Sequence, residues 1–162
     1  MTPPAPQQLA ELVRDAMLAD DHATRLLGMQ IVEVAPGRAV IRMAVRQDML
    51  NGHAICHGGL IATLADSTFA FACNSYNELT VASGFSIDLL APGRLGDVLT
   101  ATCTELSKSG RTGVYDSDVR NQRGERIAAF RGRSYTARGK PVLQVAPPTL
   151  PLAETRPDHS AP

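Results

Sequence analysis

The stretch from Gly58 to Ser75 constrains the fold of this chain more than any other part of it. It opens with two glycines and continues as good helix formers that are apolar on almost every side. A helix that is apolar all round is buried inside a protein rather than lying on its surface. We therefore expect a long central helix that the rest of the chain encloses.

One ionisable side chain, Asp66, interrupts this apolar helix two turns from its start. Aspartate is a poor helix former, and a buried carboxylate is costly unless it is paired or hydrogen-bonded. Other residues share its side of the helix at spacings of three and four residues, namely Thr63, Ser67, Ala70 and Asn74. This stripe predicts a cleft or an interface. A buried acid that is bonded to backbone at a dimer interface, without chemistry, fits the residues equally well.

The start of the same helix offers a different chemical group. Gly58 and Gly59 leave the first backbone N–H groups uncovered, and these groups carry the partial positive charge of the helix N-terminus. A carbonyl oxygen or an oxyanion could bind there. Asp66 lies about 12 Å from Gly58 along the helix axis, at 1.5 Å per residue. If both groups act on one substrate atom, the acid must come from a second copy of the chain across a two-fold axis.

The remaining pattern predicts a single α+β domain over residues 9–140. An amphipathic helix is expected at about residues 9–20, and a hairpin over 25–34 and 39–45 precedes the central helix. Alternating apolar residues then predict four strands, at 80–90, 98–106, 112–121 and 126–137, with a turn at 107–111. We expect an antiparallel sheet wrapped around the helix, a disordered segment at 1–8, and an unstructured Pro-rich tail at 141–162.

Composition narrows the class of protein. The chain has 162 residues, of which 44% are hydrophobic, enough for one domain with a real core. Equal numbers of basic and acidic residues, 16 of each, argue against nucleic acid or an anionic membrane as the main partner. Three cysteines without disulfide-scaffold spacing, and no apolar span of transmembrane length, lead us to expect a cytoplasmic protein.

Several motifs together resemble the hotdog-fold acyl-CoA thioesterases of the PaaI type, the phenylacetic acid degradation thioesterases. The similarity covers roughly residues 25–138 and is carried by Asn51-Gly-His-Ala-Ile-Cys-His-Gly-Gly59, Leu64-Ala-Asp-Ser-Thr-Phe-Ala-Phe-Ala-Cys-Asn74, Val81-Ala-Ser83, Ile87-Asp-Leu-Leu-Ala-Pro-Gly93, Gly96-Asp97, Gly113-Val-Tyr-Asp116 and Phe130-Arg-Gly-Arg-Ser134. The resemblance implies a hotdog fold and a homo-oligomer, either a dimer or a dimer of dimers. It also implies hydrolysis of aryl-acetyl-CoA, such as hydroxyphenylacetyl-CoA, with coenzyme A as part of the substrate and no other cofactor.

The same resemblance implies roles for four catalytic residues. Asp66 is expected to be the general base that activates water, or else the nucleophile that forms a mixed anhydride. The Gly58 N–H is expected to polarise the thioester carbonyl and to hold the oxyanion. His57 could donate a hydrogen bond there, although a role in orienting the loop is favoured. Asn51 matches a position that contacts the acyl group or the attacking water, but it could also be an ordinary turn residue.

Further residues are candidates for binding the substrate. Four of them lie in or near the predicted helix and the strand after it, namely Gly59, Ser67, Thr68 and Ser83. Three others are positively charged and could bind the coenzyme A phosphates, namely Lys108, Arg111 and Arg133. Helix hydroxyls are equally well explained by bonds to the preceding turn, and each cation by ordinary solvated surface charge.

Other chemistries are weaker fits to the sequence. His53, Cys56 and His57 lack a second pair of metal ligands, so we expect no metal. A Cys56–His57 nucleophile pair is disfavoured because neighbouring side chains rarely point together. No phosphate-binding glycine loop has the required spacing. Two alternative functions remain open: a hotdog dehydratase or hydratase, and an acyl-CoA-binding domain without turnover.

Overall fold

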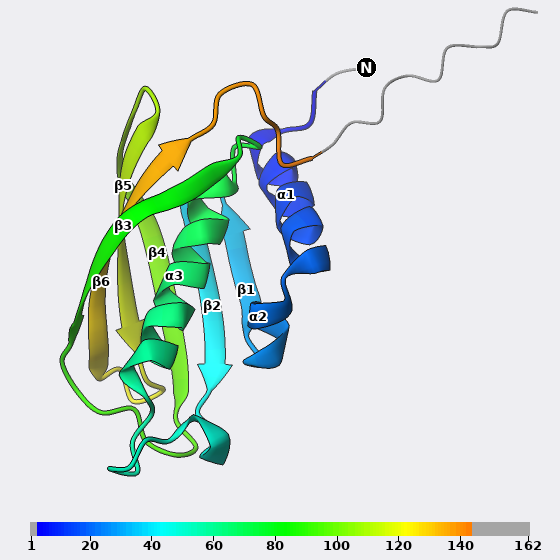
Figure 1. The fold of residues 1–162 in the computed structure, drawn as a ribbon. Helices are drawn as coiled ribbons and strands as arrows, with labels where there is room; N and C mark the ends of the chain where they lie inside the picture. The colour runs from blue at the N-terminus through cyan, green and yellow to red at the C-terminus, as the bar shows by residue number, and fades with distance from the viewer. Residues whose placement is uncertain (1–2, 144–162) are drawn as a thin grey trace, which may run out of the picture.

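The computed structural model describes residues 3–143, which form one antiparallel sheet with helices on one face. The helices and strands are α1 (Pro6–Asp20), α2 (His22–Leu26), β1 (Gln30–Ala35), β2 (Arg38–Ala44), the 3-10 helix η1 (Gln47–Met49), α3 (Gly58–Asn74), β3 (Thr80–Leu89), β4 (Val98–Ser109), β5 (Thr112–Arg120) and β6 (Arg126–Thr136). The six strands have the order β1-β2-β4-β5-β6-β3, so β1 and β3 are the edges. Figure 1 shows α3 lying along one face of the sheet, with α1 and α2 beside it on the side of β1, and α1 contacts β1. The predicted α+β sheet around a central helix is confirmed.

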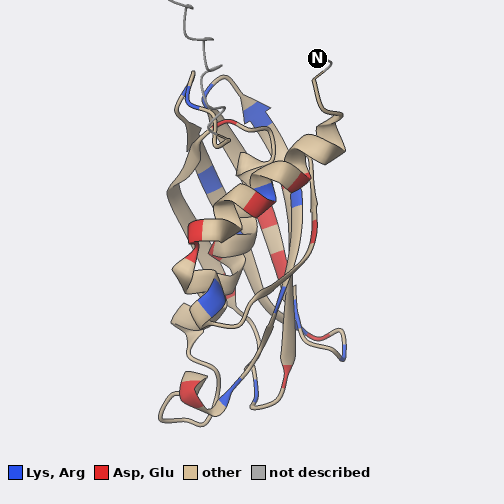
Figure 2. Ribbon diagram, turned by 90° about the vertical axis from the view of Figure 1, so that its right-hand side faces the viewer, with Lys and Arg blue, Asp and Glu red and all other residues tan. Residues whose placement is uncertain are grey.

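The hydrophobic core lies between α3 and the sheet. Leu64, Phe69 and Phe71 of α3 are almost completely buried. The Phe69 ring packs 5.3 Å from that of Tyr115 and 6.0 Å from that of Phe130, measured between centroids. Burying one such side chain contributes about 1.5–3 kcal/mol, so this interface is a main source of stability. In the side view of Figure 2 the helices stand on one side of the sheet, and basic and acidic residues are interspersed.

The segment before the first strand differs from the prediction. Residues 22–26 form α2, and the strand that we expected from residue 25 begins at Gln30. The reason is the sequence just before α2: the Asp21 carboxylate accepts the Thr24 N–H at 2.9 Å and the Thr24 hydroxyl at 2.7 Å, which caps a short helix. Gly28, with a φ of 64°, then ends the helical turn.

The predicted boundaries also change at two other places. Helix α1 begins at Pro6, so the last residues of the segment expected to be disordered are helical. Proline suits the first helical turn, and the Gln7 side chain donates to the Val34 carbonyl at 2.9 Å. Strand β4 extends to Ser109, into the predicted 107–111 turn, because Gly110 at a φ of 60° permits a two-residue hairpin loop. Of the predicted tail, residues 144–162 lie outside the described part of the chain.

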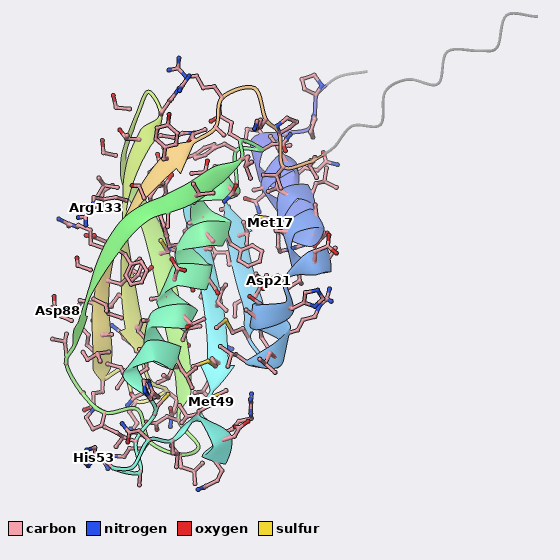
Figure 3. The ribbon with its side chains drawn as sticks, in the orientation of Figure 1. Met17, Asp21, Met49, His53, Asp88 and Arg133 are labelled. Carbon is pink, nitrogen blue, oxygen red and sulfur yellow. The ribbon has the colours of Figure 1, made fainter. Side chains whose placement is uncertain are left out.

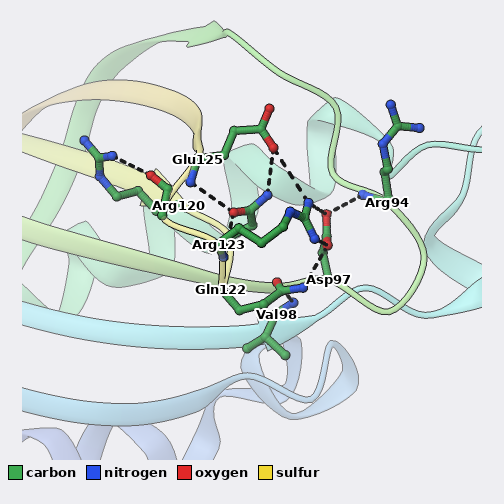
Figure 4. Close-up of polar contacts among 9 residues, drawn as sticks. Arg94, Asp97, Val98, Arg120, Gln122, Arg123 and Glu125 are labelled. Carbon is green, nitrogen blue, oxygen red and sulfur yellow. Dashed lines mark hydrogen bonds and ion pairs between the residues drawn. The ribbon is translucent and has the colours of Figure 1, made fainter.

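A buried carboxylate ties the β3–β4 loop to the β5–β6 turn. Asp97, which is 3% exposed, accepts hydrogen bonds from the Arg123 guanidinium at 2.8 Å, the Gln122 amide at 3.1 Å and the Arg94 backbone N–H at 2.9 Å (Figure 4). The Arg123 guanidinium, assisted by the Arg94 N–H and the Gln122 amide, holds the pKa of Asp97 below its usual range. This cluster fixes the loop that follows β3.

Replacing Asp97 with alanine is expected to lower the free energy of unfolding by about 2 kcal/mol, the scale of hydrogen bonds to a charged group. Because the native pKa is lowered, this contribution is present above the ordinary aspartate value of 3.8 and is lost as pH falls through the native pKa. Denaturant unfolding at pH 7 and at acid pH measures both effects. Asp15→Ala, which removes an exposed ion pair with Arg14, is the control and should leave stability unchanged.

Candidate functional site

A pocket of about 410 Å³ lies at the start of α3. Its lining is mostly apolar and comes from the loop before α3, the first turns of α3 and the segment after β3: Asn51, Ile55, Cys56, Gly58, Ile61, Leu89, Leu90, Ala91, Pro92 and Gly93. The Cys56 N–H donates to the Gly93 carbonyl at 2.8 Å, which joins the two walls. Two residues predicted to be catalytic, Asn51 and Gly58, therefore share one pocket.

His57 is the N-cap of α3 and controls which backbone donors are open. Its Nδ1 accepts the Gly59 N–H at 3.0 Å, so the Gly59 amide predicted to bind substrate is already occupied. The Gly58 N–H has no acceptor within residues 3–143. The helix dipole adds partial positive charge at this group. A pocket-lining donor is thus open at Gly58, and the side chain of His57 caps the helix start.

The lack of a side chain at Gly58 also leaves room for Leu89. A Cβ atom at this position would lie 2.5 Å from Cδ1 of Leu89, at the end of β3. Glycine therefore allows strand β3 to approach the helix start, which leaves the backbone N–H as the group that residue 58 presents to the pocket.

Asn51 organises the loop that leads to the helix. Its Oδ1 accepts the backbone N–H groups of His53 at 2.9 Å and Ile55 at 3.4 Å, and its own N–H donates to the Ile55 carbonyl at 2.9 Å. These bonds give Asn51 the turn role that the sequence left open. Its Nδ2 has no acceptor in the described part of the chain, and the residue lines the pocket, so a donor for a ligand is also available.

Asp66 lies outside this pocket, on the part of α3 that the sheet does not cover completely. Its carboxylate has no hydrogen bond or ion pair to any residue from 3 to 143, and burial raises its pKa. Thr63, Ser67 and Ala70 on the same stripe are likewise only partly buried. The separation of about 12 Å from Gly58 along the helix axis holds because α3 is one unbroken helix.

Two other stripe or site residues are part of the core, and here the predictions were wrong. Thr68 is fully buried and its hydroxyl donates to the Leu64 carbonyl at 2.7 Å, so it cannot contact a substrate. Asn74, which is 4% exposed, accepts the Thr80 N–H at 2.9 Å and donates to the Thr80 carbonyl at 2.8 Å. These bonds join the end of α3 to the start of β3.

Edge strand β3 exposes several apolar side chains. Val81, Phe85 and Leu89 are 57%, 45% and 53% exposed, and the edge that does not face β6 is unpaired among the described strands. Ser83 lies at a bulge in this strand, and its hydroxyl donates to the Arg133 carbonyl at 3.1 Å. An open apolar edge is prone to pair with another chain.

The three predicted phosphate-binding cations do not gather at the pocket. Lys108 forms an ion pair with Glu78 at 2.6 Å and lies 4.3 Å above the Tyr76 ring, and Arg111 donates to the Tyr135 hydroxyl at 3.0 Å. Arg133 is exposed on β6, and Figure 3 shows it far from His53, which lies in the loop before α3. None of the three lines the pocket.

Sequence reasoning missed the wall formed by residues 89–93. The sequence interpretation placed the end of a strand at residue 90 and included residues 87–93 only as a motif of the resemblance. The available signal was the run Leu89-Leu90-Ala91, which breaks the alternation of apolar and polar residues just before Pro92-Gly93. Asp97, four residues after this wall, entered the sequence interpretation only as part of the Gly96-Asp97 motif.

The other chemistries considered from sequence gain no support. Burial raises the pKa of the Cys56 thiol, which disfavours a thiolate nucleophile, and burial raises the pKa of Cys73 and Cys103 to about 12. Among residues 3–143 no group of three or more His, Cys, Asp or Glu side chains could hold a metal ion. Within the same range no helix is long and apolar enough to cross a membrane.

Comparison with known proteins identifies the family. The model of the thioesterase superfamily matches residues 53–128, which include the helix start and Asp66. Acyl-coenzyme A thioesterase PaaI of Escherichia coli K12 is 45% identical over 124 residues, which are 76% of this chain and 89% of that protein. The chain belongs to the thioesterase superfamily.

Solved structures agree with this membership. The structure of E. coli PaaI, described as a protein from the phenylacetic acid degradation operon, matches with a TM-score of 0.82 and 42% identity, covering 84% of this chain and 99% of that one. A hypothetical thioesterase protein from Streptococcus pneumoniae, solved with coenzyme A, matches with a TM-score of 0.65 and 28% identity over 67% of this chain and 88% of that one. The predicted hotdog fold, the PaaI-type resemblance and the class of thioester hydrolase are confirmed.

Proposed function

We propose that this superfamily member hydrolyses acyl-CoA in an active site shared between two copies of the chain. The observation that carries the proposal is the separation of two unsatisfied groups on one helix. The Gly58 N–H opens into the pocket, whereas the Asp66 carboxylate has no partner and lies outside it. Since about 12 Å of helix separates them, one chain cannot present both groups to one thioester carbon.

The exposed edge of β3 is the surface that we propose for pairing. Two copies that join β3 to β3 in antiparallel fashion continue the sheet and cover Val81, Phe85 and Leu89. A two-fold axis perpendicular to this sheet keeps both α3 helices on the same face and reverses the direction of one relative to the other. The start of one helix then approaches the later part of its neighbour. A dimer of dimers would require a further surface.

The proposed chemistry uses the two groups in turn. The thioester carbonyl oxygen accepts the Gly58 N–H, which also holds the negative charge of the tetrahedral intermediate. The partner subunit's Asp66 removes a proton from water as the oxygen attacks the carbonyl carbon, or attacks directly to form an anhydride that water then cleaves. In both routes the C–S bond breaks, the thiol of coenzyme A takes up a proton, and the free acid leaves. No resident cofactor enters these steps.

We propose aryl-acetyl-CoA, such as hydroxyphenylacetyl-CoA, as the substrate in the degradation of phenylacetate or related aromatic compounds. The support is the 45% identity to E. coli PaaI and the largely apolar pocket of about 410 Å³, a size that suits a small ligand. Three free cysteines fit the expected cytoplasmic location.

Release of thiol from a panel of acyl-CoA compounds tests the function. We expect thiol release with the highest kcat/KM for aryl-acetyl-CoA and lower values for acetyl-CoA and long acyl chains. A dehydratase or hydratase would change the acyl chain without releasing thiol, and a binding domain would do neither. Either result would overturn the proposed hydrolysis, whereas a different preferred acyl group would overturn only the substrate.

A further inference from the structure

One peptide group beside the pocket is hydrogen-bonded at both of its ends. The carbonyl of Gly93 accepts the Cys56 N–H at 2.8 Å. The N–H of the same peptide, which belongs to Arg94, donates to the Asp97 carboxylate at 2.9 Å (Figure 4). Because a peptide group is planar, a bond that fixes its N–H also fixes the direction of its carbonyl. Asp97 therefore orients the acceptor of the Cys56 N–H, although Asp97 itself does not line the pocket.

The Asp97 carboxylate is held from the side away from the pocket. Its Oδ1 accepts hydrogen bonds from the Arg123 guanidinium and the Gln122 amide of the β5–β6 turn, and its Oδ2 accepts the Arg94 N–H. The Asp97 backbone carbonyl accepts the Val45 N–H at 2.8 Å, just after β2. The carboxylate is thus anchored to the sheet, and it can hold the 93–94 peptide in one orientation.

The pocket wall and the start of α3 are in close contact at this peptide. A Cβ atom on Gly93 would lie 3.2 Å from Cβ of Cys56 and 3.9 Å from Cδ1 of Ile61, in the first turn of α3. The next residue after Cys56 is also held, because the His57 N–H donates to the Met49 carbonyl at 2.9 Å. A rotation of the 93–94 peptide would therefore move the segment that leads into the helix.

We propose that Asp97 is a positioning residue for the oxyanion donor of its own chain. Asp97 orients the 93–94 peptide, this peptide places Cys56, and the Gly58 N–H follows two residues later. An oxyanion donor acts only when it is fixed in advance at the place where the negative charge develops. This inference rests on the proposed function, because it assumes that the Gly58 N–H binds the thioester oxygen.

NMR spectroscopy tests the position of the Gly58 N–H without turnover. In protein labelled with ¹⁵N-glycine, the Gly58 resonance is assigned by its absence from Gly58→Ala. Asp97→Ala is expected to shift this resonance, and Asp97→Asn, which keeps an oxygen for the Arg94 N–H, is expected to shift it less. Val13→Ala, which removes buried methyl groups from α1, is the matched control for lost stability and should leave the resonance in place. An unshifted Gly58 resonance in Asp97→Ala would overturn the positioning role, whether or not the protein hydrolyses thioesters.

Kinetics show whether Asp97 acts through Gly58. The measurements use the Leu89→Ala protein, which has room for a side chain at position 58. In this protein Asp97→Ala is expected to lower kcat about tenfold, less than loss of the donor itself. When Gly58→Pro has already removed the donor, Asp97→Ala should lower kcat no further. An equal loss with glycine and with proline at position 58 would contradict the proposal, because Asp97 would then act on the wall or on stability alone.

Mixed dimers assign the effect to one chain. When an Asp66→Asn chain pairs with a Gly58→Pro chain, both with Leu89→Ala, the working site takes its oxyanion donor from the Asp66→Asn chain. Asp97→Ala in that chain should lower thiol release about tenfold, whereas Asp97→Ala in the Gly58→Pro chain should leave it unchanged. Each dimer carries one copy of the substitution, so a general loss of stability predicts equal release from both. Equal release would overturn the positioning role.

The remaining outcomes separate this inference from the proposed function. If Asp97→Ala does not fold, Asp97→Asn takes its place, with a smaller loss that still depends on which chain carries it. No recovery of activity in mixed dimers with an intact Asp97 would overturn the shared site, and the comparison of glycine with proline at position 58 would still test Asp97. No thiol release from the wild type would overturn the proposed function, and the Gly58 resonance would still test Asp97.

Discussion

Asp66→Asn is expected to reduce kcat for acyl-CoA hydrolysis by about 10²–10⁴-fold, because the substitution removes the group proposed to activate water or to attack the thioester. The amide has nearly the same shape as the carboxylate, so the helix and the pocket should be preserved. Stopped-flow or steady-state thiol release measures the effect. Ser67→Ala changes the neighbouring residue on the same stripe and should have a much smaller effect. Full turnover in the Asp66→Asn protein would remove this residue from the mechanism.

A stability measurement separates loss of chemistry from loss of fold in this variant. Burial raises the native pKa of Asp66 above the ordinary value of 3.8, so the charged form destabilises the folded state at pH 7. The wild type therefore loses stability as pH rises through the native pKa. Asparagine has no such charge, and we expect the Asp66→Asn protein to have a Tm at pH 7 equal to or above that of the wild type. The gap should close as pH falls below 3.8. A markedly lower Tm would show that the carboxylate stabilises the fold.

Gly58→Pro is expected to lower kcat by about 10²–10³-fold relative to Gly58→Ala, because proline removes one oxyanion donor and alanine keeps it. The site is suited to this comparison. Gly58 is the first residue of α3, where proline is tolerated, and His57 has a φ of −59° and a ψ of 128°, which proline allows in the residue before it. Both variants add a Cβ atom at the same place.

The added Cβ atom needs its own control, since it would lie 2.5 Å from Cδ1 of Leu89. Both substitutions should therefore be made together with Leu89→Ala, which removes the clashing atom. If the N–H is the functional group, Gly58→Ala with Leu89→Ala retains most of the kcat of the Leu89→Ala protein, and the proline counterpart does not. Equal kcat values for the alanine and proline proteins would instead assign Gly58 a purely steric role.

The fold was largely predictable because its main elements depend on local patterns. The apolar run from residue 58 to 74 specified a buried helix, and alternation specified the strands after it. The errors lie where a single side chain overrides the pattern. Leu26 and Leu27 suggested a strand, but the hydrogen bonds that Thr24 donates to the Asp21 carboxylate cap a helical turn there. The hairpin at Gly110 was tighter than the polar residues around it suggested.

The site was predictable in part, because residues on one helix lie at distances that the helix geometry fixes. Gly58 and Asp66 could be placed about 12 Å apart along the helix from sequence alone, and the structure keeps them apart. The segment at 89–93 and the orientation of Thr68 could not be placed, because they depend on how β3 and the sheet meet the helix. Tertiary contacts of this kind also hold Lys108, whose ammonium group pairs with the Glu78 carboxylate and lies over the Tyr76 ring.

Mixing two inactive proteins tests the shared site most directly. Subunits with Asp66→Asn and subunits with Gly58→Pro, both carrying Leu89→Ala and each carrying a different affinity tag, are combined, and the mixed dimers are isolated by both tags. In a mixed dimer one site has both functional groups intact and the other has neither, so thiol release should return to about half of that of the Leu89→Ala dimer. If each chain holds its own complete site, both sites of the mixed dimer carry a defect. Isolated mixed dimers that are no more active than the parent proteins would contradict an active site shared between two copies of the chain.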